Sequence, residues 1–141
     1  LVGGRGWGSE PFYDRVEELR AAGRPIVLPR DVDDARLFAA YRVARFTVFP
    51  SLNEGYGLPV AESLACGTPV VTSAFGSMAE IAAQGGALTV DPRDDHDLAR
   101  AMERLLRDDE LLDRLRSEAR CVPRRSWDDY AAQLWATLAG Q

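Results

Sequence analysis

Two glutamates and two glycines near the centre of the chain have the side-chain chemistry to bind a charged, hydroxyl-bearing ligand. Glu54 and Glu62 lie eight positions apart, with Gly55 and Gly57 between them. Glycine lets a ligand approach the backbone closely and allows φ angles that other residues avoid. A carboxylate can accept hydrogen bonds from both hydroxyls of a ribose. These residue types therefore indicate a site for a ligand with both negative charge and hydroxyl groups, if the local structure brings them together.

The segments around this stretch predict a strand, a loop and a helix. A buried strand is expected over residues 46–49, and Pro50 ends it because proline cannot donate to a sheet ladder. A helix is expected to begin at Pro59 and to end at Gly67. The first turn of such a helix has free N–H groups and the positive end of the helix dipole. The loop is therefore expected to present an anion site.

The segment EGYGLP at residues 54–59 lies inside an E-x7-E pattern and is followed by ACGTPVVTS at residues 65–73. This ordered run resembles the signature of the retaining glycosyltransferases of family 4, which have the GT-B fold. The resemblance covers nearly the whole chain, through to SWD at residues 126–128. It implies a nucleotide diphosphate-sugar donor and transfer without a bound metal or other cofactor. It also implies attack on the leaving-group face, without a clear enzymic nucleophile.

The same resemblance implies roles for individual residues. Glu54, which we assign to catalysis, would contact hydroxyls of the donor sugar, and Glu62 would hold the ribose. Backbone N–H groups between the two would hold the distal phosphate and the sugar, and we expect the ring of Tyr56 to pack against protein. The nucleotide base would lie by Arg30 and Val32. The expected donor-binding residues are thus Glu54, Gly55, Tyr56, Gly57, Leu58 and Glu62.

Both glutamates also have purely structural interpretations. Glu62 could be a surface residue that the helix dipole favours, and Glu54 could cap the free N–H groups itself. A ligand role is favoured for Glu62 because an unpaired glutamate on a largely buried helix would be costly. A ligand role is also favoured for Glu54. The two loop glycines cost conformational entropy on folding, and a ligand close to the backbone would explain their presence.

Two hydrolase classes fit the sequence less well. A glycosidase pair of carboxylates would leave the glycine loop unexplained, and nothing in the sequence indicates a sugar groove lined by aromatic residues. A serine hydrolase lacks its G-x-S-x-G segment.

Two other polar features favour structural roles. Residues 31–33 form a D-x-D, which some glycosyltransferases of the other major fold use to bind a metal and a diphosphate. We expect instead that Asp33 or Asp34 caps a helix over residues 35–41, because capping needs only one such side chain. His96, the single histidine, lies beside another expected helix cap and is predicted to be a solvated surface residue.

Alternating strands and helices predict an α/β fold, a Rossmann-like three-layer sandwich with a mainly parallel sheet. The family resemblance implies that this domain is the C-terminal half of a GT-B fold. The strands are expected at residues 26–28, 46–49, 69–72 and 87–90. By the family's pattern, the first strand and helix would precede Leu1, and residues 1–2 would end the second strand. The expected organisation is an N-terminally truncated nucleotide-sugar-binding domain over residues 1–125, with residues 126–141 as its C-terminal helix. Because an unpaired apolar edge at residues 46–49 is a template for association, the fragment is expected to self-associate.

The composition and net charge of the chain argue against several functions and classes of binding partner. A chain of 141 residues with 46% hydrophobic residues suits one globular domain, and a net charge of −5 disfavours nucleic acid. The sequence contains no lysine, which excludes a P-loop lysine and a Schiff-base lysine within it. The two cysteines lack metal or redox spacing, which suggests a reducing compartment. We expect a cytoplasmic protein, with peripheral association at the inner face of the membrane as an option for the full-length form.

The expected partners follow from the resemblance. The donor is a nucleotide-sugar, and the acceptor would be bound by an N-terminal domain missing from this chain. The family's Arg and Lys that neutralise the diphosphate, in a G-R-x5-K-type loop, are expected upstream of Leu1. The chain alone is therefore expected to bind donor weakly and to catalyse little. The alternatives are a non-catalytic nucleotide-binding module of the same fold, or a nucleotide-sugar epimerase; the E-x7-E pattern favours a transferase over the epimerase.

Overall fold

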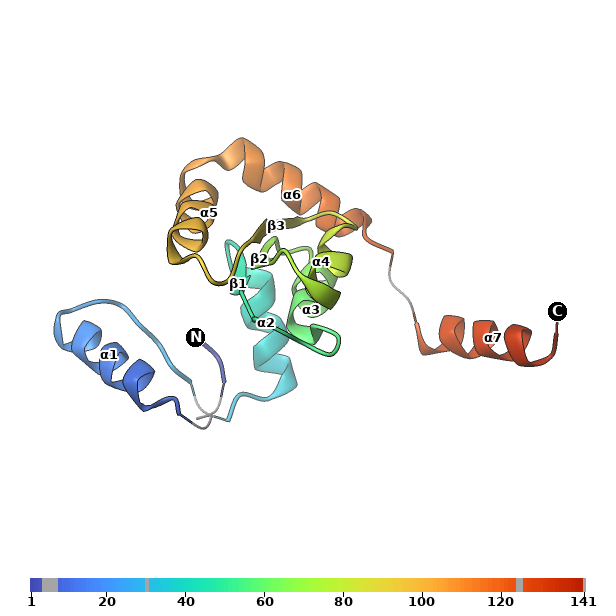
Figure 1. Ribbon diagram of the computed structural model, residues 1–141, viewed down its shortest axis with the longest axis horizontal. Helices are drawn as coiled ribbons and strands as arrows, with labels where there is room; N and C mark the ends of the chain where they lie inside the picture. The colour runs from blue at the N-terminus through green and yellow to red at the C-terminus, as the bar shows by residue number, and fades with distance from the viewer. Residues whose placement is uncertain (4–7, 30, 124–125, 141) are drawn as a thin grey trace. The chain divides into compact units, whose positions relative to one another are not determined.

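The computed structural model describes residues 1–3, 8–29, 31–123 and 126–140, and Figure 1 shows the course of the chain. The chain forms two compact units, Leu1–Ala40 and Tyr41–Gln141, which are described separately below. No helix in these described ranges is long and apolar enough to cross a membrane. The division expected from the sequence, residues 1–125 with a final helix, differs from these two units and stays a prediction.

The first unit is built around α1 (Glu10–Ala21), which buries Val16. The helix ends before Gly23, whose φ of +77° suits a glycine at a helix stop. The strand expected over residues 26–28 is wrong: no strand forms there, and Val27 is exposed. A strand exists only as part of a ladder, and in the described residues this segment has few partners. The Leu1 nitrogen donates to the Val27 carbonyl at 2.9 Å, and residues 1–2 form no strand either.

Helix α2 (Asp34–Val43) begins with an aspartate cap. The Oδ1 atom of Asp33 accepts a hydrogen bond from the Arg36 N–H at 2.8 Å. This satisfies one of the donors that the first turn of a helix leaves free. The capping interpretation of the D-x-D segment is therefore confirmed for Asp33.

The second unit contains a three-stranded parallel sheet in the order β1-β2-β3. Its strands are β1 (Thr47–Phe49), β2 (Val70–Ser73) and β3 (Ala87–Val90). Thr47 pairs with Val70, which in turn pairs with Ala87. Three of the four strands expected from the sequence therefore form, each within one or two residues of the expected position. In the described part of the chain β1 pairs only with β2, so it is an edge strand.

Helices cover both faces of the sheet (Figure 1). On one face, α3 (Leu58–Ala65) and α4 (Gly76–Ala82) pack with Val70. On the other, α5 (Asp95–Arg107) and α6 (Asp109–Cys121) pack with Val71. Adjacent residues of a strand point to opposite faces, which is why β2 is fully buried along its length. The α/β class, the parallel sheet and the three layers are thus confirmed.

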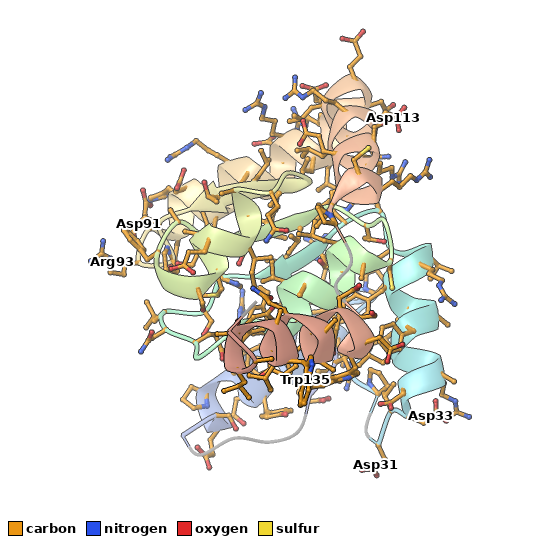
Figure 2. All side chains as sticks on the ribbon, turned by 90° about the vertical axis from the view of Figure 1, so that its right-hand side faces the viewer. Asp31, Asp33, Asp91, Arg93, Asp113 and Trp135 are labelled. Carbon is orange, nitrogen blue, oxygen red and sulfur yellow. The ribbon has the colours of Figure 1, made fainter. Side chains whose placement is uncertain are left out.

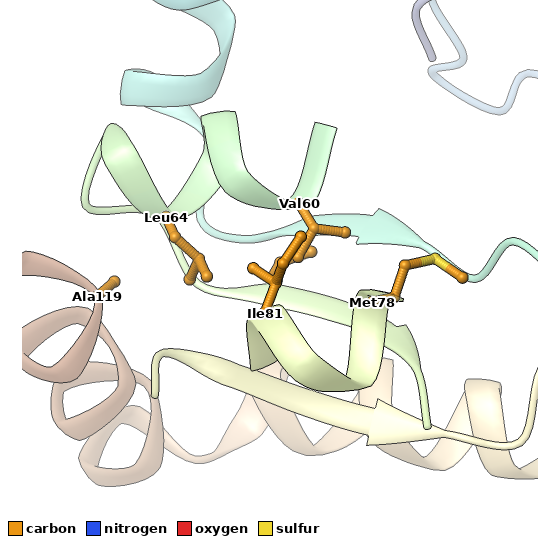
Figure 3. Packing of buried hydrophobic residues seen from close by; sticks show 6 residues of the cluster. Val60, Leu64, Met78, Ile81 and Ala119 are labelled. Carbon is orange, nitrogen blue, oxygen red and sulfur yellow. The ribbon is translucent and has the colours of Figure 1, made fainter. Parts of the chain in front are cut away.

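The packing between α3, α4 and the sheet forms one hydrophobic cluster (Figure 3). Val60 and Leu64 of α3 meet Met78 and Ile81 of α4, and Ala119 from the last turn of α6 completes it. Full burial of a Val, Leu, Ile or Met side chain stabilises a fold by about 1.5–3 kcal/mol. The cluster fixes α3 against the sheet, and thereby fixes the loop that precedes α3.

The later helices also begin with side-chain caps. Asp94 Oδ1 accepts from the His96 N–H at 2.9 Å, and Asp108 Oδ1 accepts from the Leu111 N–H at 2.8 Å. The side chain of His96 is exposed, as expected. Helix α7 (Trp127–Leu138) begins with a capping box, in which the Ser126 hydroxyl accepts from the Asp129 N–H at 3.1 Å.

Gly86, just before β3, gives a test of this packing. A Cβ at this position would lie 2.7 Å from the Ala119 Cβ and 2.8 Å from a methyl carbon of Leu64, at a φ of +79°. Backbone strain and overpacking together predict that Gly86→Ala lowers the free energy of unfolding by about 2–5 kcal/mol. Gly76→Ala is the matched control: its φ is +60° with open space around the Cβ, so only about 1–2 kcal/mol of strain is expected. Equal losses in chemical denaturation would contradict the packing described.

Candidate functional site

The loop over residues 50–57 leaves the carboxyl end of β1 and leads into α3. In open parallel sheets, ligands bind outside the carboxyl ends of the strands. The loop that leads from β2 to α4 starts at the same edge, because β1 and β2 are parallel. The Thr72 hydroxyl donates to the Phe49 carbonyl at 2.9 Å and ties the two strand ends together. The sequence-predicted residues from Glu54 to Leu58 therefore lie where this fold binds ligands.

The start of α3 has free backbone donors. Gly57 is the residue before the helix, with a left-handed φ of +95° and no side-chain cap. Its carbonyl accepts from the N–H groups of Val60 at 3.0 Å and Ala61 at 3.3 Å. Within the described part of the chain, the N–H groups of Gly55, Tyr56, Gly57 and Leu58 donate to no protein acceptor. With the positive end of the helix dipole, these groups can bind an anion.

Glu54 does not cap this helix. Its Oε1 atom accepts from the Ser51 hydroxyl at 3.1 Å, and its backbone carbonyl accepts from the Ser77 hydroxyl at 3.1 Å. The carboxylate is half-buried and is held on the loop that precedes the free N–H groups. The competing interpretation, in which Glu54 satisfies these donors itself, is therefore wrong. A carboxylate in this place can still accept hydrogen bonds from hydroxyl groups of a ligand.

The two loop glycines have different surroundings. A Cβ at Gly57 would point into the protein, 3.1 Å from the Met78 Cγ and 3.6 Å from the Ile81 Cδ1. A Cβ at Gly55 would meet nothing within 4 Å. Gly57 thus serves the backbone turn and the packing of α4, whereas Gly55 leaves space in front of the backbone. A substitution at Gly57 would disturb the core, so the open side of the loop is tested at Gly55.

Glu62 lies on the second turn of α3 and already has a protein partner. The Tyr41 hydroxyl donates to its Oε2 atom at 3.0 Å. The side chain is half-buried, between the buried Val60 and Leu64 face and the solvent. The argument that Glu62 needs a ligand as its partner on a buried helix is therefore wrong: the side chain is only half-buried and Tyr41 is its partner. Its carboxylate keeps lone pairs beyond the one that Tyr41 uses, so it can accept from ligand hydroxyls as well.

Other predicted site residues are placed as follows. The side chains of Tyr56 and Leu58 are 62% and 61% exposed, so the expected packing of the Tyr56 ring is wrong and only its backbone fits the predicted role. Val32, in the first unit, lines a pocket with residues of α1, including Tyr13 and Arg20. Arg30 lies outside the described residues. The assignment of a nucleotide base to Arg30 and Val32 stays a prediction.

Three polar residues that support the two glutamates carry no signal in the sequence patterns. They are Tyr41, Ser51 and Ser77. Ser51 is three residues from Glu54 in the sequence. Ser77 is 23 residues from its partner Glu54, and Tyr41 is 21 residues from its partner Glu62. Such contacts depend on how the elements pack, which a linear spacing rule does not describe.

A charged residue also lies beyond β3. Arg93 makes a bidentate pair with Asp91, at 2.9 and 2.8 Å (Figure 2). Its guanidinium lies 5.0 Å from the centre of the Phe75 ring. The hydrogen bonds from Arg93 lower the pKa of Asp91 to about 2. The pair is exposed, and it links the loop before α4 with the turn after β3.

Together, the parallel sheet, the helices on both of its faces and the uncapped start of α3 at its carboxyl edge define a three-layer α/β domain. The sequence model described as "Glycosyl transferases group 1" matches residues 1–122. The chain therefore belongs to the glycosyl transferases group 1 family.

Curated relatives and a solved structure agree with this family. The chain is 37% identical over 111 residues to O-antigen chain mannosyltransferase B of Escherichia coli, covering 77% of this chain and 28% of that protein. It is 39% identical over 105 residues to the D-inositol 3-phosphate glycosyltransferase of Xylanimonas cellulosilytica, covering 73% and 25%. The chain thus spans about a quarter of the length of these relatives.

The structure is similar to that of a sucrose-phosphate synthase from Thermosynechococcus elongatus, with a TM-score of 0.78 and 30% identity. The likeness covers 99% of this chain and 38% of that one. The GT-B-type fold expected from the sequence is therefore confirmed.

The bond between Tyr41 and Glu62 predicts a dependence of stability on alkaline pH. Burial and the Glu62 carboxylate raise the pKa of Tyr41 from 10.0 to about 12. Because the folded protein holds this proton more tightly than the unfolded chain, the contribution is complete below pH 10 and is lost as the pH rises through 12. The thermal midpoint of Tyr41→Phe is expected to fall less between pH 10 and 12 than that of the wild type. Parallel curves for the two proteins would show that the bond is not made.

Proposed function

We propose that this chain is the donor-binding domain of a retaining glycosyltransferase that uses a nucleotide diphosphate-sugar. The observation that carries the proposal is the row of free N–H groups from Gly55 to Leu58 at the start of α3. The family match and the relatives named as mannosyltransferases and glycosyltransferases support it. The activity of the whole protein, including its acceptor, is part of the proposal.

The distal phosphate and the donor sugar are proposed to lie over these N–H groups. When the bond between sugar and diphosphate breaks, negative charge grows on the leaving phosphate oxygens. Preorganised N–H groups and a helix dipole stabilise such charge without having to reorganise, which lowers the barrier to transfer. This stabilisation needs no metal ion from the protein, so we propose a metal-independent reaction.

The two glutamates are proposed to bind opposite ends of the donor. Glu54 lies on the loop before the free N–H groups and would accept hydrogen bonds from hydroxyls of the sugar, close to the reacting carbon. Glu62 lies one turn further along α3 than the anion site and would accept from the ribose hydroxyls. Fixing both ends holds the scissile bond in one place, and such positioning is itself a large part of catalysis.

The ribose assignment is tested with Glu62→Gln in the full-length protein. The substitution removes a charged acceptor but keeps its shape, so donor affinity is expected to fall by about 1.5–3 kcal/mol. The thermal midpoint without ligand should fall only slightly, because the amide oxygen can still accept the hydrogen bond from Tyr41. Glu110→Gln, at an exposed position on α6, is the matched control and should leave both quantities unchanged. A large loss of ligand-free stability with unchanged donor affinity would mean that Glu62 is structural.

The phosphate assignment is tested at the two glycines. Gly55→Val places a side chain in the open space before the N–H groups and should abolish donor binding, with little change in unfolding free energy. Gly57→Val should instead destabilise the domain, because its Cβ meets Met78 at an unfavourable φ. Calorimetric titration with donor and thermal melts measure both effects. Undiminished donor binding by a well-folded Gly55→Val would contradict the phosphate assignment.

A further inference from the structure

The hydrogen bond from Tyr41 to Glu62 joins a proposed ligand-binding side chain to a residue outside the E-x7-E segment. The phenolic oxygen lies 3.0 Å from Oε2 of the carboxylate. A hydroxyl has a single proton to donate, and here it goes to Glu62. Hydrogen bonds to charged groups are stronger than those between neutral groups. Tyr41 is thus a specific partner for one of the two carboxylate oxygens.

Tyr41 itself is held by the buried polar framework behind α3. Thr68, only 4% exposed, donates from its hydroxyl to the Tyr41 carbonyl at 2.7 Å. The Thr68 carbonyl in turn accepts from the Ser63 hydroxyl at 3.0 Å, and Ser63 Oγ lies 2.6 Å from the Thr47 hydroxyl. Ser63 follows Glu62 directly in the chain. The same framework therefore fixes the backbone on both sides of the phenol–carboxylate bond.

This arrangement holds one oxygen of Glu62 and leaves the other for a ligand. A free glutamate side chain loses as much as about 2 kcal/mol of conformational entropy when it is ordered. A carboxylate that is already oriented by Tyr41 avoids much of that loss when ligand binds. The phenol is a donor at neutral pH, as any tyrosine is, and its pKa of about 12 keeps it a donor at alkaline pH as well.

We infer that Tyr41 is a positioning residue, which orients the Glu62 carboxylate for the ribose hydroxyls of the donor. The inference rests on the proposed function of Glu62. It adds that recognition of the ribose depends on a second residue, outside the loop and helix that carry the E-x7-E pattern. Tyr41 touches Glu62 and acts through it.

The test compares a ribonucleotide with an analogue that lacks the hydroxyls. The full-length protein is titrated with UDP, GDP and ADP, and the tightest of these is compared with its 2′,3′-dideoxy form. Tyr41→Phe is expected to reduce the preference for the ribonucleotide by about two- to twelvefold, the range for one hydrogen bond. Affinity for the dideoxy form should stay unchanged. Tyr130→Phe removes a hydroxyl from α7 instead, and should leave the preference as in the wild type.

A double-mutant cycle shows whether Tyr41 acts through Glu62. In the Glu62→Gln background, Tyr41→Phe should have no further effect on the preference, because interacting residues are not additive. Tyr41→4-aminophenylalanine, which restores an N–H donor, should recover part of the lost preference. It also provides a second variant if phenylalanine destabilises the domain.

The outcomes separate the two proposals. If Tyr41→Phe weakens both ligands equally, or neither, the positioning role is wrong while the ribose role of Glu62 stands. If Glu62→Gln keeps the full preference for the ribonucleotide, the ribose role is wrong and the positioning role falls with it. Failure of all three nucleoside diphosphates to bind would overturn both.

Discussion

The burial of β2 on both faces is the constraint on which the site depends. Val70 packs under α3 and α4, and Val71 packs under α5 and α6, so helices must cover both sides of a parallel sheet. Each connection then has to run from one end of the sheet to the other through a helix. The loop from β1 and the start of α3 are therefore placed at the carboxyl edge. Hydrophobic packing thus leaves the N–H groups of residues 55–58 at the edge where such folds bind ligands.

Side-chain hydroxyl groups that donate to backbone carbonyls also hold the loops and element ends around the site in place. Thr72 binds the end of β1, Ser77 binds the loop at Glu54, and Thr68 binds the end of α2 at Tyr41. In the described part of the chain, no buried side-chain nitrogen or oxygen lacks a hydrogen-bond partner. A loop held in this way keeps its shape before ligand arrives, so less binding energy is needed to order it. This order is the physical basis on which we propose a preformed donor site.

The sequence predicted the second unit well because its signals are local. The apolar run that becomes β2, the stop at Pro50 and the helix cap expected beside His96 each act through neighbouring residues. The apolar trio at residues 26–28 looks the same in sequence, but a strand also needs a partner, and local pattern does not supply one. Likewise, the partner of Glu62 is 21 residues away. The direction in which a Cβ at Gly57 would point depends on where α4 packs.

The central claim is that one ligand spans the start of α3 and Glu62. A crystal structure of the full-length protein with a bound nucleoside diphosphate tests it most directly. The account predicts the distal phosphate within hydrogen-bond distance of the N–H groups of residues 55–58, with the ribose hydroxyls at the Glu62 carboxylate and Tyr41 still bound to Oε2. A diphosphate bound elsewhere, with the N–H groups at the start of α3 facing only solvent, would contradict it.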